Sequence, residues 1–287
     1  MLPLILGAGY AGLVLGERLR ARGLTVRATT THAERRAALA ARGLEPHVVD
    51  LSTGDGLSAA LEGATHLVLL APPVPGQAAD ALAAHLAGAG ARRLARVVYG
   101  STTGVYGAHV GVVDEATPAA PAHARGRARL EVEAALAALG PPTTQVRIAG
   151  IYGPGRTLAE SLRGGRFVLV DDAPTTSRVH VVDLARLLER ALDDDAPPII
   201  LAADGHPATT AEVARYTASL LGLPMPTSVA RDEAARVLSP LALEMRLGGH
   251  AIVPRDTARL LPDGLVYPTY VEGVRASLEA EGLLAPR

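Results

Sequence analysis

Three glycines near the N-terminus, spaced as Gly-x-Gly-x-x-Gly, form the clearest candidate site for chemistry. They follow the apolar run 2–6 directly and open a stretch with the periodicity of an amphipathic helix. Glycines let a backbone approach a pyrophosphate closely, and a helix N-terminus offers free N–H groups and a partial positive charge. This context predicts a dinucleotide site; a tight turn without a ligand is the alternative. Its residues are Gly7, Gly9, Tyr10, Ala11 and Gly12.

The end of the second predicted strand, 25–28, bears on the choice of dinucleotide. NAD sites place an acidic residue here on the ribose 2′-hydroxyl, and this strand ends without one. Thr30 or Thr31 could hydrogen-bond a 2′-phosphate, and Arg35 could pair with it. We therefore predict NADP as the cofactor. NAD is the alternative, because Glu34 could still reach a ribose and Arg35 could belong to a solvated helix face.

The composition excludes several other kinds of chemistry. The combined lysine and arginine count is 28, every one of these residues is arginine, and the chain has no cysteine. A Schiff-base lysine, a P-loop lysine and a lysine-assisted tyrosine acid are therefore excluded. Without cysteine there is no disulfide, no thiol nucleophile and no thiolate zinc site. We expect no metal, and any redox chemistry would need a bound cofactor.

Charge and hydropathy also limit the partners that the chain can have. The net charge is −1 and aromatic residues make up 3%, which argues against a nucleic-acid surface. No apolar run approaches the roughly 20 residues that span a bilayer, and Met1 is not followed by a signal-peptide pattern. We expect a cytoplasmic protein with a small-molecule substrate and neither nucleic-acid nor membrane partners.

Short apolar runs alternate with helical patterns through the first half of the chain. The predicted strands are 2–6, 25–28, 45–50, 65–71, 96–99 and 145–149, and the helices between them include 34–41, 58–61, 77–89 and 126–139. Strands that are apolar throughout, rather than alternating, indicate a parallel sheet covered on both faces. The predicted fold class is α/β, a Rossmann-type doubly wound parallel sheet.

Beyond residue 152 the alternation loosens. Glycine and proline interrupt 153–177, and the later helical patterns are 182–192, 210–221, 231–238 and 271–281. We predict a dinucleotide-binding domain at 1–152 and a smaller C-terminal substrate lobe at 153–287. The apolar run 199–203 is expected to return to the sheet of the first domain.

Several motifs in the first 190 or so residues share one resemblance. They are Gly7-Ala-Gly9-Tyr-Ala-Gly12, Asp50-Leu51, Tyr99-Gly-Ser101-Thr102-Thr103-Gly-Val-Tyr106-Gly107, Asp114-Glu115, Arg147-Ile-Ala-Gly-Ile-Tyr152-Gly-Pro-Gly155 and Arg178-Val-His180-Val-Val-Asp183. In this order they resemble the extended short-chain dehydrogenase/reductases, the NAD(P)-dependent epimerase/dehydratase family. The resemblance implies two further sets of residues. The cofactor set is Asp50, Leu51, Ala71, Pro72, Pro73, Ser101, Arg129 and Tyr152, and the substrate set is Thr103, Arg156 and His180.

In that family a serine or threonine after the fifth strand and a Tyr-x-x-x-Lys pair on the next helix carry catalysis. Thr102 matches the hydroxyl residue. An alignment without gaps places Arg125 at the tyrosine position and Arg129 at the lysine position, which resembles the atypical members. A guanidinium can hydrogen-bond ribose hydroxyls, but Arg125 cannot replace a phenol as a proton donor. Tyr106 and His123 are candidates for a relocated donor; a pocket-wall residue and a solvent-facing residue are the respective alternatives.

Two functions therefore stay open. The first is an atypical oxidoreductase or epimerase acting on a small substrate, which would be anionic if several arginines line its cleft. The arginines that could line this cleft are Arg125, Arg129, Arg147, Arg156 and Arg178. The second function is a dinucleotide-binding sensor or scaffold without catalysis.

Tyr152 and His180, assigned above to the cofactor and the substrate, could instead be buried hydrogen-bonding residues. The resemblance also implies a homodimer, because the helices that match 77–89 and 126–139 pair across a dimer interface in that family. Both carry alanine and leucine on more than one face, as a buried surface would.

Overall fold

The computed structural model describes residues 1–285 except 75, 108, 110 and 166. The chain divides into two compact units that interleave along the sequence. Unit 1 comprises Met1–Val105, Pro121–Ile148 and Leu184–Ile200, and unit 2 comprises Tyr106–Ala120, Ala149–Asp183 and Leu201–Arg287. The chain thus passes between the units several times, whereas the sequence pattern predicted a division after residue 152 with a single return at 199–203.

A seven-stranded sheet with the order β11-β7-β5-β4-β1-β2-β3 makes up most of unit 1, and the boundary between the units falls inside β11, after Ile200. Its strands are β1 (Pro3–Leu6), β2 (Arg27–Thr30), β3 (Glu45–Val48), β4 (His66–Leu69), β5 (Arg96–Thr102), β7 (Thr143–Ile148) and β11 (Ile199–Ala202). The pairings among β1, β2, β3, β4, β5 and β7 are all parallel. The predicted α/β class with a doubly wound sheet is confirmed.

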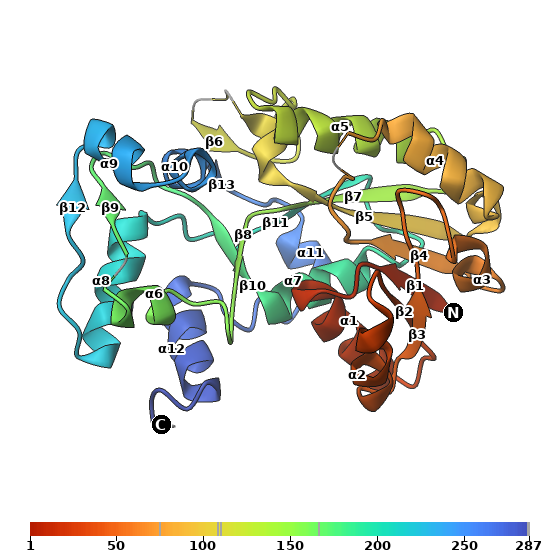
Figure 1. Cartoon of the computed structure of the whole chain (residues 1–287), viewed down its shortest axis with the longest axis horizontal. Coiled ribbons are helices and arrows are strands. Elements are labelled where there is room, and N and C mark those ends of the chain that lie inside the picture. The colour runs from red at the N-terminus through yellow and green to blue at the C-terminus, as the bar shows by residue number, and fades with distance from the viewer. Residues whose placement is uncertain (75, 108, 110, 166, 286–287) are drawn as a thin grey trace. The chain divides into compact units, whose positions relative to one another are not determined.

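Helices cover both faces of this sheet, with α4 and α5 above it and α1, α2 and α7 below it in Figure 1. The helices are α1 (Tyr10–Ala21), α2 (Arg36–Ala41), α3 (Leu57–Leu61), α4 (Ala79–Gly88), α5 (Ala124–Ala137) and α7 (Val181–Arg190), and 3₁₀ turns lie at Ala33–Arg35, Ala91–Arg93 and Thr103–Tyr106. Because both faces are covered, β1 and β4 are buried at every position, and their residues are apolar except for His66 at the start of β4.

The strand order places a topological switch point between β1 and β4. From β1 the chain proceeds to β2 and β3 on one side, and β4 and β5 extend the sheet on the other side. Ligands of open parallel sheets bind outside the carboxyl ends of the strands at such a point. The glycine turn at the carboxyl end of β1 lies at this place.

Unit 2 contains short strand pairs and a group of helices. Its strands are β6 (Val112–Val113), β8 (Gly150–Tyr152), β9 (Leu169–Val170), β10 (Arg178–His180), β12 (Ser228–Val229) and β13 (Ala251–Ile252), and its helices are α6 (Ala159–Arg163), α8 (Thr210–Leu221), α9 (Arg231–Val237), α10 (Pro240–Leu247), α11 (Thr257–Leu260) and α12 (Tyr270–Ala280). The pairs β8–β10, β9–β12 and β6–β13 are parallel. Helix α8 packs against both α6 and α12.

The fifth strand runs farther than its sequence suggested. We expected it at 96–99, but β5 continues through Gly100 to Thr102. A Cβ on Gly100 would lie 2.6 Å from Leu70 Cδ2, so glycine is required here by close packing and does not end the strand. The extension places Thr102 at the carboxyl edge of the sheet.

Over the described part of the chain, no helix combines the length and the apolar character needed to cross a membrane.

Candidate functional site

The three glycines of the first turn have different structural roles. Gly7 has a φ of +95°, and a Cβ there would lie 2.6 Å from the backbone nitrogen of Ala71. A Cβ on Gly12 would lie 2.7 Å from the Gly7 carbonyl oxygen. A Cβ on Gly9, by contrast, would have no described atom within 4 Å. The fold therefore requires glycine at positions 7 and 12, and position 9 leaves a space that a ligand could enter.

Helix α1 starts at this turn without a side-chain cap among the described residues. Its N-cap is Gly9, and the N–H groups in the first turn of a helix point outward along its axis, where an anion can approach them. Thr29 fixes the turn from the neighbouring strand. Its hydroxyl accepts a hydrogen bond from the Gly7 N–H at 3.0 Å, and its carbonyl accepts one from the Ala8 N–H at 3.0 Å. Sequence reasoning missed Thr29, although a polar residue in a buried strand was a signal.

The end of β2 and the residues after it differ in burial. Thr30 is buried, and its hydroxyl accepts a hydrogen bond from the His32 N–H at 3.1 Å. Thr31, Arg35 and Arg36 are exposed. Glu34 lies 3.6 Å from His32, measured from Oε1 to Nδ1. Of the two threonines predicted to bind a 2′-phosphate, Thr31 therefore has the more accessible hydroxyl.

The other predicted cofactor residues after β3 and β4 also lie in unit 1. Asp50 is exposed, and its Oδ1 accepts hydrogen bonds from the N–H and the hydroxyl of Ser52, which hold the pKa of the carboxyl below its usual value. Leu51 and Ala71 pack against the core beneath α4, and Pro72 and Pro73 follow in the same loop. The Ala71 N–H donates to the Leu6 carbonyl at 3.1 Å, which holds this loop beside the glycine turn.

Thr102 lies where β5 ends, as its resemblance to the family's hydroxyl residue implied. Its Oγ1 accepts a hydrogen bond from the Gly104 N–H at 3.1 Å, and Thr103 begins the 3₁₀ turn. A Cβ on Gly126 would lie 2.6 Å from the Gly104 carbonyl oxygen. This close approach sets the first turn of α5 against the loop after β5, within unit 1.

Helix α5 carries the two arginines that stand at the tyrosine and lysine positions. Arg125 is exposed on the first turn of the helix. Arg129 is half-buried, and its Nη1 donates to the Gly100 carbonyl at 2.8 Å and to the Tyr99 hydroxyl at 3.2 Å. The structure therefore places a fixed cation, but no phenol, on the part of α5 nearest the carboxyl end of β5.

Ser101 does not face the edge where the other cofactor candidates lie. Its side chain is only 4% exposed, and its hydroxyl donates to Glu133 Oε1 at 2.5 Å. Glu133 also forms a buried ion pair with Arg147, with 2.7 Å between Oε2 and Nη2. Ser101, which we expected to contact the cofactor, instead belongs to this network between β5, α5 and β7. Arg147 is likewise committed to structure.

Three other predicted residues of unit 2 are buried. Tyr106 is 0% exposed and meets the His250 ring edge-on at 6.3 Å between centroids. The Tyr152 hydroxyl donates to the Thr269 carbonyl at 3.2 Å, and burial raises the pKa of the phenol. His180 meets Tyr152 edge-on at 5.2 Å. These contacts match the alternative in which Tyr152 and His180 are buried hydrogen-bonding residues.

The His180 ring has a defined neutral form. Its Nδ1 accepts from the Val182 N–H at 3.2 Å, so the proton resides on Nε2, which donates to the Ser277 hydroxyl at 3.2 Å. The Ser277 hydroxyl in turn donates to the Gly273 carbonyl. Burial lowers the pKa of His180 to about 4. A neutral, enclosed imidazole of this kind fixes α12 to β10.

The two remaining arginines of the proposed anion cleft differ in exposure. Arg156 is exposed in the turn after β8. Arg178 is largely buried, and its Nη2 donates to the Thr176 hydroxyl and to the Ala208 carbonyl, both at 3.1 Å. Arg178 therefore holds the backbone of unit 2 together. Of the five arginines, Arg147 and Arg178 are committed to structure.

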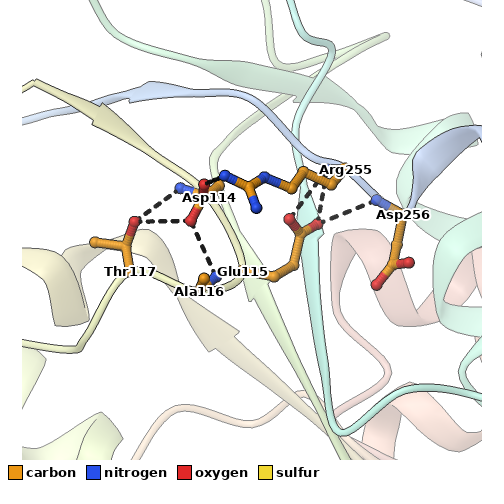
Figure 2. A network of polar contacts seen from close by, with 6 residues as sticks. All are labelled: Asp114, Glu115, Ala116, Thr117, Arg255 and Asp256. Carbon is orange, nitrogen blue, oxygen red and sulfur yellow. Dashed lines mark hydrogen bonds and ion pairs between the residues drawn. The ribbon is translucent and has the colours of Figure 1, made fainter.

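Figure 2 shows how the loop after the 3₁₀ turn is fixed within unit 2. Asp114 forms an ion pair with the Arg255 guanidinium and accepts from Thr117. The Glu115 carboxylate accepts from the backbone N–H groups of Arg255, at 3.0 Å, and Asp256. The paired strands β6 and β13 continue into this network, so these two carboxylates hold the loop in place.

Two cavities of the structure lie away from the predicted residues. One of about 240 Å³ in unit 2 is lined by Asp171, Thr210, Ser228 and Arg246 among others. A shallower one of about 680 Å³ lies between the ends of α3 and α4. None of the residues predicted to bind cofactor or substrate lines either cavity. Across the described residues, no group of three or more histidine, aspartate or glutamate side chains could hold a metal ion.

A comparison with known proteins finds a relative that is similar in sequence. The chain is 30% identical over 239 residues to Protein YeeZ of Escherichia coli K12, a match that covers 77% of this chain and 84% of YeeZ. No family model matches the chain. The conserved protein of unknown function from Silicibacter pomeroyi is 32% identical, and its structure has a TM-score of 0.86 with 97% of this chain and 98% of its own chain covered.

Two further structures carry the family's name. A protein of Methylobacillus flagellatus, named for the NAD-dependent epimerase/dehydratases, is 26% identical with a TM-score of 0.69 and covers 97% of each chain. The human epimerase family protein SDR39U1, solved with NADPH, is 20% identical with a TM-score of 0.77 and covers 97% of this chain and 99% of its own. With the relative at 30% identity and these folds, the chain belongs to the extended short-chain dehydrogenase/reductases, the NAD-dependent epimerase/dehydratase family.

Proposed function

We propose that this protein binds NADP(H) at the carboxyl edge of the sheet in unit 1. One observation carries the proposal: the glycine turn lies at the switch point of the sheet, where Gly9 leaves open space and no described side chain caps the start of α1. Dinucleotide pyrophosphates bind at such helix N-termini. The NADPH present in the structure of human SDR39U1 supports a nicotinamide dinucleotide for this fold.

The residues at the turn fit this group. The N–H groups at the start of α1 would hold the pyrophosphate, and Gly9 would let it approach the backbone. Thr29 would keep the turn open by holding the Gly7 N–H. When bound, the nicotinamide supplies or accepts a hydride. Arg129 and Thr102 lie at the carboxyl end of β5, where they would meet the nicotinamide half.

The surroundings of β2 favour NADP over NAD. The strand ends without an acid, and Thr31, Arg35 and Arg36 are exposed next to it. A 2′-phosphate carries two negative charges that guanidinium groups bind well. Glu34, the acid that an NAD site could use, lies beside His32 instead.

We further propose an oxidoreductase or epimerase activity on a small substrate. The Thr102 hydroxyl would hydrogen-bond the substrate oxygen, and the positive potential of Arg129 would stabilise negative charge that develops on it. No phenol stands on α5 beside these groups, so the proton must come from another donor. Arg156 is exposed, and we propose that it binds an anionic group of the substrate.

A second candidate function is a dinucleotide sensor without catalysis. It is favoured by the exposed Arg125 in place of a phenol and by the complete burial of Tyr106, the nearest tyrosine after Thr102. A screen of carbonyl and alcohol substrates with NADPH separates the two functions. Turnover by the unmodified protein would exclude the sensor. Turnover only after introducing R125Y and R129K together would exclude the oxidoreductase.

Calorimetric titration of NADPH and NADH tests the cofactor proposal. We expect NADPH to bind more tightly, and Arg35→Ala to weaken NADPH by about tenfold while leaving NADH unchanged, because a charged hydrogen bond to the 2′-phosphate is lost. Arg42→Ala is a matched control: it removes the same charge beyond the other end of α2, where Arg42 pairs with Glu17. Equal affinity for both dinucleotides would refute the preference for NADP.

We also propose that the protein forms a homodimer through α4 and α5. The two helices lie side by side on one face of the sheet, and their outer positions include several alanines. Light scattering coupled to gel filtration should give twice the chain mass of 29.5 kDa. Placing an arginine at Ala134, which is exposed on α5, should then give the monomer mass.

A further inference from the structure

Tyr99 is a buried phenol in the middle of β5, between Val98 and Gly100. Its side chain is 0% exposed and belongs to the core beneath α4 and α5. Burial raises the pKa of the phenol, so it stays neutral at physiological pH. A phenylalanine would fill the same volume without a polar atom to satisfy. The hydroxyl therefore requires a separate explanation.

The hydroxyl contacts the guanidinium of Arg129. Arg129 Nη1 donates to the Tyr99 hydroxyl at 3.2 Å and to the Gly100 carbonyl at 2.8 Å, and the guanidinium carbon lies 5.7 Å from the centroid of the Tyr99 ring. Among the described residues, Arg129 makes these two hydrogen bonds, and both use Nη1. Nε and Nη2 are left for another partner.

Arg129 is connected to the glycine turn by a short series of contacts inside unit 1. Gly7 closely approaches the backbone of Ala71, whose neighbour Leu70 packs against Gly100. The Gly100 carbonyl then accepts from Arg129. The cation thus lies at the same carboxyl edge as the glycine turn, beyond β4. That edge is where a dinucleotide extends across a sheet of this order.

We propose that Tyr99 is a positioning residue that fixes Arg129 before the dinucleotide binds. The inference rests on the proposed binding of NADP(H). With Nη1 held by two acceptors, the arginine presents Nε and Nη2 to the ribose hydroxyls of the nicotinamide half. An arginine side chain carries considerable rotamer entropy. Holding it in advance removes the part of the binding cost that arises from ordering this side chain.

A double-mutant cycle measured by NADPH calorimetry tests the inference. Tyr99→Phe should weaken NADPH about two- to tenfold, the effect of leaving one side chain to be ordered on binding. Arg129→Ala should weaken it further. In the Arg129→Ala background, Tyr99→Phe should have no additional effect, because no guanidinium remains to be positioned. Thermal unfolding of each variant checks that its fold is retained.

Tyr216→Phe is the matched control, since it removes a phenol hydroxyl that donates to the Val271 carbonyl in unit 2. It should leave the NADPH affinity unchanged. An unchanged affinity for Tyr99→Phe would overturn the inference, as would an equal loss in both backgrounds, which a purely structural role would give. If the unmodified protein binds no NADPH, the proposed function fails and the inference fails with it. If only the cycle shows no coupling, the proposed function stands.

Discussion

At the scale of single residues, Glu133 is a buried acid whose loss should lower stability. Its carboxylate accepts from Ser101 on β5 and from Arg147 on β7 while its own backbone lies in α5. All three side chains are buried, so the ion pair is shielded from water. Removing one partner of such a pair leaves an uncompensated charge in the interior.

We predict that Glu133→Ala lowers the free energy of unfolding by about 3–5 kcal/mol, the usual loss when a buried pair is broken from one side. Urea denaturation followed by circular dichroism measures it. Glu131→Ala, an exposed position on the same helix, should change stability little. Equal losses in the two variants would show that the buried network does not stabilise α5.

At the scale of elements, the network in Figure 2 fixes the loop 112–117 to the segment after β13. Glu115 is its central acceptor, because both oxygens of its carboxylate receive the backbone N–H of Arg255. The paired strands β6 and β13 have only two residues each. Strands of this length hold weakly without additional contacts, so the carboxylate determines whether the loop stays in place.

We predict that Glu115→Ala makes the backbone N–H groups of Arg255 and Asp256 exchange with solvent about fivefold faster or more, which corresponds to the loss of about one hydrogen bond. Hydrogen–deuterium exchange with mass spectrometry measures this. Glu233→Ala, on α9 in the same unit, should leave the exchange of this segment unchanged. Unchanged exchange in Glu115→Ala would mean that β13 holds the segment without the carboxylate.

Sequence reasoning located the long elements well and the short ones poorly. The helix predicted at 210–221 is α8 at those bounds, and the strand expected at 199–203 is β11, one residue shorter. Hydrophobic periodicity predicts these elements because each buries one face over several turns or an entire strand. The two-residue strands such as β6 and β13 have no period, and tertiary contacts alone define them.

The site shows the same division between local and long-range information. The glycine turn and Thr102 follow from local pattern, because a turn and the end of a strand are local features. The hydrogen bonds of Ser101 to Glu133 and of Arg129 to Tyr99 join residues about 30 positions apart. No spacing rule within one element predicts them. The burial of Ser101 follows from strand alternation only once the register of β5 is known.

At the scale of the whole molecule, two buried groups of unit 2 change the free energy of unfolding in opposite directions as pH changes. Burial raises the pKa of Asp204 to about 7, and it lowers the pKa of His180 to about 4. From pH 3.8 to about 7 the folded protein retains a proton on Asp204 that the unfolded chain releases, so this group's stabilisation is lost as pH rises. Below pH 6.5 the unfolded chain binds a proton that folded His180 excludes until about pH 4, so acid costs stability.

We predict that Asp204→Asn has nearly the wild-type stability at pH 4 and exceeds it by on the order of 4 kcal/mol at pH 8, because asparagine cannot ionise in this buried position. The variant should also lose stability more steeply on acidification from pH 6.5 to 4, since the opposing effect of Asp204 is gone. Denaturant unfolding across this range measures both. The surface control is Asp232→Asn on α9. A difference in the free energy of unfolding between variant and parent that is the same at every pH would refute the ionisation of Asp204.

The most direct measurement for the central claim, that a dinucleotide binds at the glycine turn, is NADPH calorimetry on Gly9→Ala. Gly9 has an ordinary φ of −82° and open space around it, so alanine there should leave the free energy of unfolding nearly unchanged. The added methyl would occupy the space of the pyrophosphate, and NADPH affinity should fall at least tenfold. Gly88→Ala, also in open space, is the matched control and should bind as the parent does. NADPH binding that Gly9→Ala leaves unchanged, or no binding by the parent protein, would contradict the account.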